Sequence, residues 1–246
     1  MLIASKTTAP ARDSTMPSVL FVFISASKTL TGKPTGWYLP EAAHPYYILS
    51  PHVQIDFAAP AGANPPIDEY SVKSYTDDGS VKFLNDETVE QKLANAKKLV
   101  NIDYKEYDAV FYVGGHGPAI DLASDAVNAR LVSDFWKSGK IVAAVCHGPA
   151  ALVQGVDEHG QSIFKGKKFT VLSNDEEVAI NGVNEIPFSP EDKIIELGGI
   201  FEKADELFEA KTVVDGKLVT GQNPASSAGV GEAILKLIKG DQRLRE

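Results

Sequence analysis

The sequence lacks several features that mark specialised classes of protein. It has a single cysteine, Cys146, among 246 residues, so no disulfide can form within the chain. Its apolar runs stay well below the roughly 18 residues that a transmembrane helix needs. The net charge of -9 comes from scattered acidic residues, and no cluster of lysine and arginine could neutralise a row of phosphates. We therefore expect neither a membrane nor nucleic acid among the partners.

Sequence signals for bound metals and nucleotides are also missing. There is no C-x-x-C or H-x-x-x-H motif and no group of carboxylates at metal-ligand spacing. The glycine-rich segment VGGHGPA, residues 113–119, fits neither G-x-G-x-x-G nor G-x-x-x-x-G-K-[ST]. We predict no catalytic metal and no cofactor.

What is present suits a globular protein of a reducing compartment. With 43% hydrophobic residues, the chain can bury one substantial core. Residues 1–15, rich in Ser, Thr and Ala, are expected to form a disordered extension, with mitochondrial targeting as the weaker alternative. Residues 16–246 are expected to form a single domain. We expect a cytoplasmic location, with a nuclear one also open.

Short β-branched and aromatic runs alternate with helical patterns, which indicates β-α-β units and a mostly parallel sheet between helices. The Asp-Gly turn in TVVDGKLVTG adds a small antiparallel hairpin. The predicted strands are 19–24, 53–58, 109–113, 141–145, 169–172 and 218–220. The predicted helices are 39–49, 86–96, 121–138, 149–154, 191–197 and 224–239.

The sole cysteine lies where a predicted buried strand turns directly into a helix, in the segment AVCHGPAAL. Ligands of open α/β sheets bind beyond the carboxyl ends of the strands, and a helix N-terminus there favours negative charge. We therefore expect a lowered pKa for the Cys146 thiol and a nucleophilic role. The alternative is a buried small apolar residue.

Four segments together resemble the ThiJ/PfpI superfamily, whose fold is like that of the class I glutamine amidotransferases. They are VFYVGGHGPAIDL, GKIVAAVCHGPAAL, LSNDEE and VTGQNPASS, and they occur in this order. The segment TGWYLPEAAHPYYIL is similar to the branch of fungal glutathione-independent glyoxalases (glyoxalase III), also known as heat-inducible chaperones. The resemblance runs from about Met16 to the C-terminus.

The resemblance implies the roles of individual residues. It places the nucleophile at Cys146, its histidine at His147 and the acid that orients the histidine at Glu177, with Glu176 as the neighbouring candidate. It places a second essential carboxyl, in contact with the cysteine sulfur, at Glu41. The turn that contains Gly114, Gly115 and His116 is implied to supply oxyanion and substrate contacts.

A carboxyl beside a thiol in a poorly solvated pocket should be protonated when the sulfur is a thiolate. Such a pair can also shuttle a proton to a substrate. The resemblance to the glyoxalases implies a lyase that converts methylglyoxal, or a similar small 2-oxoaldehyde, to D-lactate without glutathione. A chaperone or holdase, a cysteine redox sensor, and peptidase or deglycase activity remain alternatives. The resemblance also implies a homodimer, and the segments 64–91 and 184–192 could shape a lid or a dimer face.

Overall fold

The fold is built on a central sheet whose strands are almost entirely apolar. The computed structural model of the chain describes residues 16–243. Within them, seven strands form one sheet in the order β3-β2-β1-β4-β5-β9-β8, and β6 and β7 form a second, two-stranded sheet. The expected extension at residues 1–15 lies outside the described residues. None of the helices within the described range combines the length and apolar character that a membrane crossing requires.

All pairings in the large sheet are parallel except that of β8 with β9, which confirms the predicted hairpin. The strands are β1 (Ser18–Val22), β2 (Gln54–Ala59), β3 (Lys97–Lys98), β4 (Ala109–Tyr112), β5 (Ile141–Val145), β6 (Lys168–Phe169), β7 (Ile200–Phe201), β8 (Thr212–Asp215) and β9 (Leu218–Gly221). The helices are α1 (Leu39–Leu49), α2 (Glu69–Ser74), α3 (Asp78–Leu84), α4 (Glu87–Ala94), α5 (Gly117–Ile120), α6 (Ala126–Lys137), α7 (Asn174–Ala179), α8 (Pro190–Glu196) and α9 (Ser227–Arg243). Short 3₁₀ turns span Leu99–Asn101, Tyr104–Glu106, Leu122–Ser124, Gly148–Leu152 and Pro224–Ser226.

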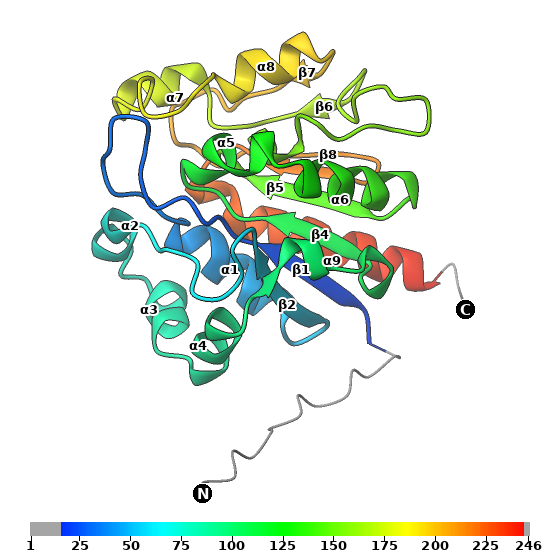
Figure 1. Ribbon diagram of the computed structural model, residues 1–246, viewed down its shortest axis with the longest axis horizontal. Helices are drawn as coiled ribbons and strands as arrows, with labels where there is room; N and C mark the ends of the chain where they lie inside the picture. The colour runs from blue at the N-terminus through cyan, green and yellow to red at the C-terminus, as the bar shows by residue number, and fades with distance from the viewer. Residues whose placement is uncertain (1–15, 244–246) are drawn as a thin grey trace, which may run out of the picture.

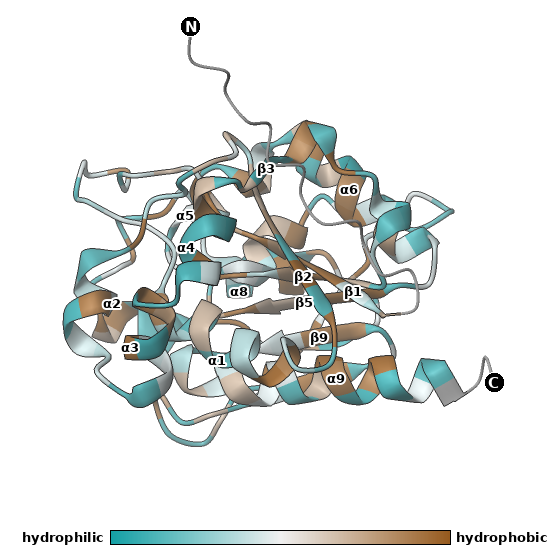
Figure 2. Cartoon of the chain, turned by 90° about the horizontal axis from the view of Figure 1, so that it is seen from below, coloured by the Kyte–Doolittle hydropathy of each residue, from teal (hydrophilic) through white to brown (hydrophobic). Residues whose placement is uncertain are grey.

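Helices cover both faces of the sheet, as the sequence pattern predicts for strands that are apolar on both sides. Helices α1 and α9 pack together on one face and α6 lies across the other, with the apolar strands between them (Figures 1 and 2). Phe21 of β1 lies opposite Phe57 of β2 and Phe111 of β4, and its ring centroid is 5.8 Å and 4.9 Å from theirs. This aromatic row fixes the register of the three strands next to α1.

Three predicted elements differ from the structure. The predicted strand 169–172 is only β6, which lies outside the large sheet. The predicted helix 121–138 breaks at Asp125, because its carboxylate accepts the amides of Val127 and Asn128 and so caps α6. The predicted helix 149–154 is the 3₁₀ turn Gly148–Leu152.

The carboxyl ends of β4, β5 and β9 lie side by side. Their registers pair Tyr112 with Ala144 and Val145 with Gly221, so the residues that follow these strands meet at one edge of the sheet. Cys146 follows β5 and the turn of Gly114 to His116 follows β4. Sheets of this type bind ligands at that edge.

Candidate active site

Cys146 lies at a sharp turn between a strand and a 3₁₀ segment. Its φ angle is 58°, in the left-handed region that residues with a side chain rarely adopt. The neighbouring backbone leaves little room, because a Cβ on Gly148 would lie 2.7 Å from the carbonyl oxygen of Tyr112. The turn therefore holds the sulfur at the sheet edge, as a nucleophile elbow does.

His147 and Glu177 extend a line of polar contacts from the sulfur. The Cys146 Sγ is 3.5 Å from Nδ1 of His147, and Nε2 of His147 is 2.6 Å from Oε2 of Glu177. Burial raises the pKa of Glu177, but the His147 imidazole outweighs it, and the net pKa falls below the usual 4.5. Glu177 is therefore an anion that can orient the imidazole, which is the arrangement of a catalytic triad.

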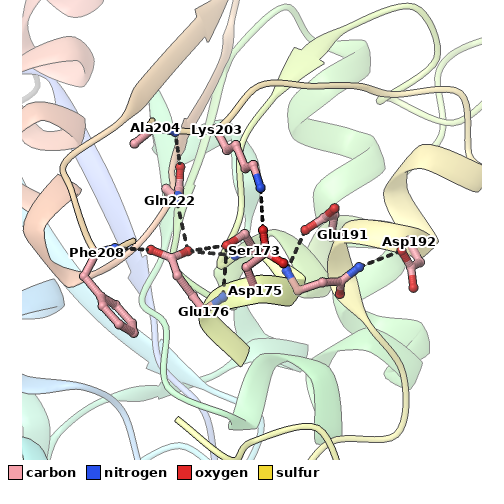
Figure 3. Close-up of polar contacts among 10 residues, drawn as sticks. Ser173, Asp175, Glu176, Glu191, Asp192, Lys203, Ala204, Phe208 and Gln222 are labelled. Atoms are coloured by element: carbon pink, nitrogen blue, oxygen red, sulfur yellow. Dashed lines mark hydrogen bonds and ion pairs between the residues drawn. The ribbon is translucent and has the colours of Figure 1, made fainter. Parts of the chain in front are cut away.

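The adjacent Glu176 has a different task. Its carboxylate accepts the backbone and side-chain groups of Ser173 at the start of α7, and also Nε2 of Gln222 and the amide of Phe208 (Figure 3). Together with a bond from Asn223, these contacts tie α7 to the segment after β9. Glu176 is thus a cap and crosslink, and Glu177 is the acid that contacts His147.

Glu41 enters the site from the first turn of α1 and is fully buried. Neither of its carboxyl oxygens has a hydrogen-bond partner of regular geometry among the described residues. Burial raises its pKa well above 4.5, and the Cys146 thiol and the Gly114 amide are the groups that oppose this shift. Burial therefore favours the protonated form of Glu41 beside the Cys146 sulfur.

The expectation of a lowered thiol pKa is wrong. Burial first, and then the Glu41 carboxylate, raise the pKa of Cys146 well above 9.0. The 3₁₀ turn Gly148–Leu152 is too short for its N-terminal field to outweigh these effects. Cys146 and Glu41 titrate as a coupled pair, in which a thiolate requires that Glu41 keep its proton. The redox-sensor alternative assumed an exposed thiol of low pKa, whereas Cys146 is 5% exposed; this alternative stays a prediction.

The glycine-rich turn after β4 is packed against this pair. A Cβ on Gly114 would lie 2.2 Å from Oε2 of Glu41 and 2.9 Å from Cβ of Cys146. Gly115 has a φ of 94°, and a Cβ there would meet the carbonyl oxygen of Gly36 at 2.2 Å. Burial, followed by the proximity of His147, lowers the pKa of His116 to about 4. The structure thus brings all seven predicted site residues together, while their chemical roles remain predictions.

A cavity of about 390 Å³ opens onto the sulfur. Cys146, His147, Glu41, Gly115 and His116 line it, and its other walls are mainly aromatic and apolar: Tyr38, Tyr70, Tyr75, Leu172, Ala179, Ile180, Phe208, Pro224 and Ala225. Tyr70 and Tyr75 come from the segment 64–91, so this segment does shape the site. The sequence did not identify the tyrosines, because nothing in their local pattern separates a cavity wall from a surface.

Fold and site together define a class of α/β proteins in which a cysteine elbow, a histidine and two carboxyls surround a cavity at the strand ends. The chain belongs to the DJ-1/PfpI family, whose model matches residues 52–237. This confirms the resemblance seen in the sequence motifs.

Two relatives with assigned names and one solved structure are similar to this chain over much of its length. A probable glutathione-independent glyoxalase of Schizosaccharomyces pombe, hsp3104, is 36% identical over 150 residues, which is 58% of this chain and 66% of that protein. Glyoxalase 3 of Candida albicans is 29% identical over 234 residues, or 89% of this chain and 98% of that protein. The crystal structure of the Rapid Encystment Protein of 24 kDa from Francisella tularensis superposes with a TM-score of 0.84 at 35% identity, covering 89% of this chain and 97% of that one.

Proposed function

We propose that this protein is a glutathione-independent glyoxalase that converts methylglyoxal, or a similar small 2-oxoaldehyde, to D-lactate. The observation that carries the proposal is the buried Glu41 carboxyl beside the Cys146 thiol, with no hydrogen-bond partner of regular geometry in the described part of the chain. A carboxyl that stays protonated next to a nucleophile can donate its proton to a substrate and later accept one. The names of the two yeast relatives support the same activity.

The first step is addition of the Cys146 thiolate to the aldehyde carbon. The carbon-sulfur bond forms as the carbonyl π electrons move to oxygen, and backbone amides near Gly115 and His147 would hold that oxygen while Glu41 supplies its proton. The product is a hemithioacetal on the enzyme. No cofactor is needed, because the sulfur takes the part that a thiol cofactor would otherwise play.

The second step moves a proton between neighbouring carbons. A base, His147 or Glu41, removes the former aldehyde proton to give an enediol, and reprotonation at the adjacent carbon gives a thioester of lactate. Water then cleaves the thioester, which releases lactate and returns the sulfur to its starting state. Glu177 would keep the imidazole oriented through both steps.

The test is the loss of methylglyoxal and the appearance of D-lactate with purified, fully reduced protein, in the absence of glutathione and added metal. Cys146→Ala should abolish turnover, and Glu41→Gln should lower it by about 10²–10⁴-fold, the usual contribution of a general acid-base group. Glu87→Gln is a matched control, since Glu87 is an exposed glutamate in the first turn of α4. Absence of turnover by well-folded wild type would refute the proposal.

A further inference from the structure

Three potential metal ligands meet at the active site although they are far apart in the sequence. His116 comes from the turn after β4, His147 from the elbow after β5, and Glu177 from α7. One ligand atom from each lies within 4.8 Å of the other two. No sequence motif announces this group, because 30 or so residues separate each member from the next along the chain.

Two atoms of this group lack partners. Nε2 of His116 and Oε1 of Glu177 are buried and make no hydrogen bond within the described residues. Buried polar atoms are nearly always paired, so each such atom calls for an explanation. Glu177 is only 4% exposed, and a Cβ on the neighbouring Gly182 would lie 1.8 Å from that same Oε1, so backbone rather than solvent surrounds it. A cation bound between the three residues would give Nε2 of His116 a partner and would meet Glu177 at Oε2, the oxygen that faces His147.

The donor set suits one kind of ion. Two imidazoles and one carboxylate are the protein ligands of many three-ligand zinc sites, with the fourth tetrahedral position left open. Ligand atoms in such a site lie about 3.3 Å apart, so a group that spans 4.8 Å needs only a modest approach of its side chains. His116 and His147 both face the cavity, which gives the ion a path from solvent and room for a water ligand.

The surrounding charge also favours a dication. Glu185 acts electrostatically on His116, as Glu177 does. Lys33, which also acts electrostatically on His116, is held by an ion pair with Glu185, 2.5 Å from its carboxylate, which reduces its repulsion of a cation.

We propose that His116, His147 and Glu177 form an inhibitory Zn²⁺ site. A cation bound to His147 displaces its contact with Glu177 and keeps the imidazole from accepting a proton, so the ion would stop turnover rather than support it. The inhibition rests on the proposed glyoxalase activity, whereas the binding does not. This site therefore goes beyond the prediction of no catalytic metal without replacing it.

Binding is tested first, with metal-free, reduced full-length protein and Co²⁺ as a spectroscopic probe. We expect one equivalent of Co²⁺ to give the visible absorption of a tetrahedral site and to be displaced by Zn²⁺. His116→Gln and Glu177→Gln should each weaken Zn²⁺ binding in calorimetry by about 100-fold or more, since even the loss of an outer partner of a metal ligand costs 10–100-fold. His159→Gln is the matched control, because His159 is an exposed histidine next to Glu158.

Cys146→Ala separates this site from a thiolate site. Retained Zn²⁺ affinity in Cys146→Ala supports the assigned ligands, and a thiolate-to-cobalt charge-transfer band that disappears in this variant would overturn them. Equal affinity in wild type and in both ligand variants, with all three folded as judged by circular dichroism, would also overturn the proposal. So would the lack of any tetrahedral Co²⁺ spectrum.

The inhibition arm uses the D-lactate assay. Zn²⁺ should inhibit wild type over the same concentration range in which it binds, and chelation should restore turnover. Binding without inhibition would overturn the regulatory half of the proposal. If wild type shows no turnover at all, the glyoxalase proposal fails, and the cobalt and calorimetric data still decide whether the metal site exists.

Discussion

Replacing Gly114 by alanine tests whether the Glu41 carboxyl is held against this glycine beside Cys146, as the proposed mechanism requires. The new Cβ would lie 2.2 Å from Oε2 of Glu41, whereas ordinary van der Waals contact begins at about 3.4 Å. The carboxyl would therefore have to retreat by at least 1.2 Å. The new Cβ would also lie 2.7 Å from the carbonyl oxygen of Val145 and 2.9 Å from Cβ of Cys146. A shift of the Gly114 backbone away from Glu41 would therefore meet these atoms.

Gly114→Ala should lower both the stability of the protein and its rate of turnover. Overpacking of a rigid buried site costs about 1–3 kcal/mol of unfolding free energy, and each kcal/mol lowers the Tm of a chain of this size by about 2–4 °C. A displacement of about 1 Å of a catalytic group costs about 100-fold in rate, so kcat/KM for methylglyoxal should fall by about that factor.

The assay for Gly114→Ala combines thermal unfolding with D-lactate kinetics. Gly240→Ala in α9 is the matched control, because a Cβ there meets nothing within 4 Å and alanine is the better helix former. The control should match wild type in rate and be at least as stable. A Gly114→Ala protein with wild-type Tm and kcat/KM within about threefold of wild type would show that Glu41 is not held against this glycine as described.

Two further predictions concern the carboxyls of the site. Because the pKa of Glu41 is raised, the folded protein keeps a proton that the unfolded chain releases above about pH 4.5. The free energy of unfolding should therefore fall as the pH rises above about 4.5. The fall should end where the Cys146–Glu41 pair loses its first proton. Glu41→Gln should remove this fall and be the more stable protein at pH 7 in urea titrations, and parallel pH profiles for the two proteins would contradict the assignment. Glu176→Gln should lower the unfolding free energy by about 2–4 kcal/mol, because several buried donors lose their charged acceptor. Glu177→Gln should instead lower kcat by at least about 100-fold with a smaller change in Tm, and the reverse pattern would exchange the roles of the two residues.

Much of the fold follows from local sequence patterns. Helix α1 has the predicted bounds, and β5 was predicted at its observed residues, because long apolar or strongly periodic segments dominate their own structure. Helices α2 and α3 were not predicted. They are six and seven residues long, too short for periodicity to identify, although their caps Asp68 and Asp77 were visible signals.

The site was predictable in its membership but not in its energetics. Glu176 and Glu177 could have been separated from the sequence, since Ser173 and Glu176 form the S-x-x-E pattern of a capping box and leave Glu177 free for other contacts. The thiol pKa could not be predicted in this way. Its direction depends on complete burial and on Glu41, which lies more than a hundred residues away along the chain.

The unfavourable features of this protein are concentrated in one place. Seven buried side-chain polar atoms lack a hydrogen bond within the described residues, and four of them belong to Glu41, His116 and Glu177. Cys146, with its left-handed backbone, lies among them. Such costs persist only where the surrounding structure enforces them, which is typical of sites that bind or react. The unpaired Glu41 then corresponds to a proton carrier for a substrate oxygen, and the unpaired Nε2 of His116 corresponds to a ligand for a cation.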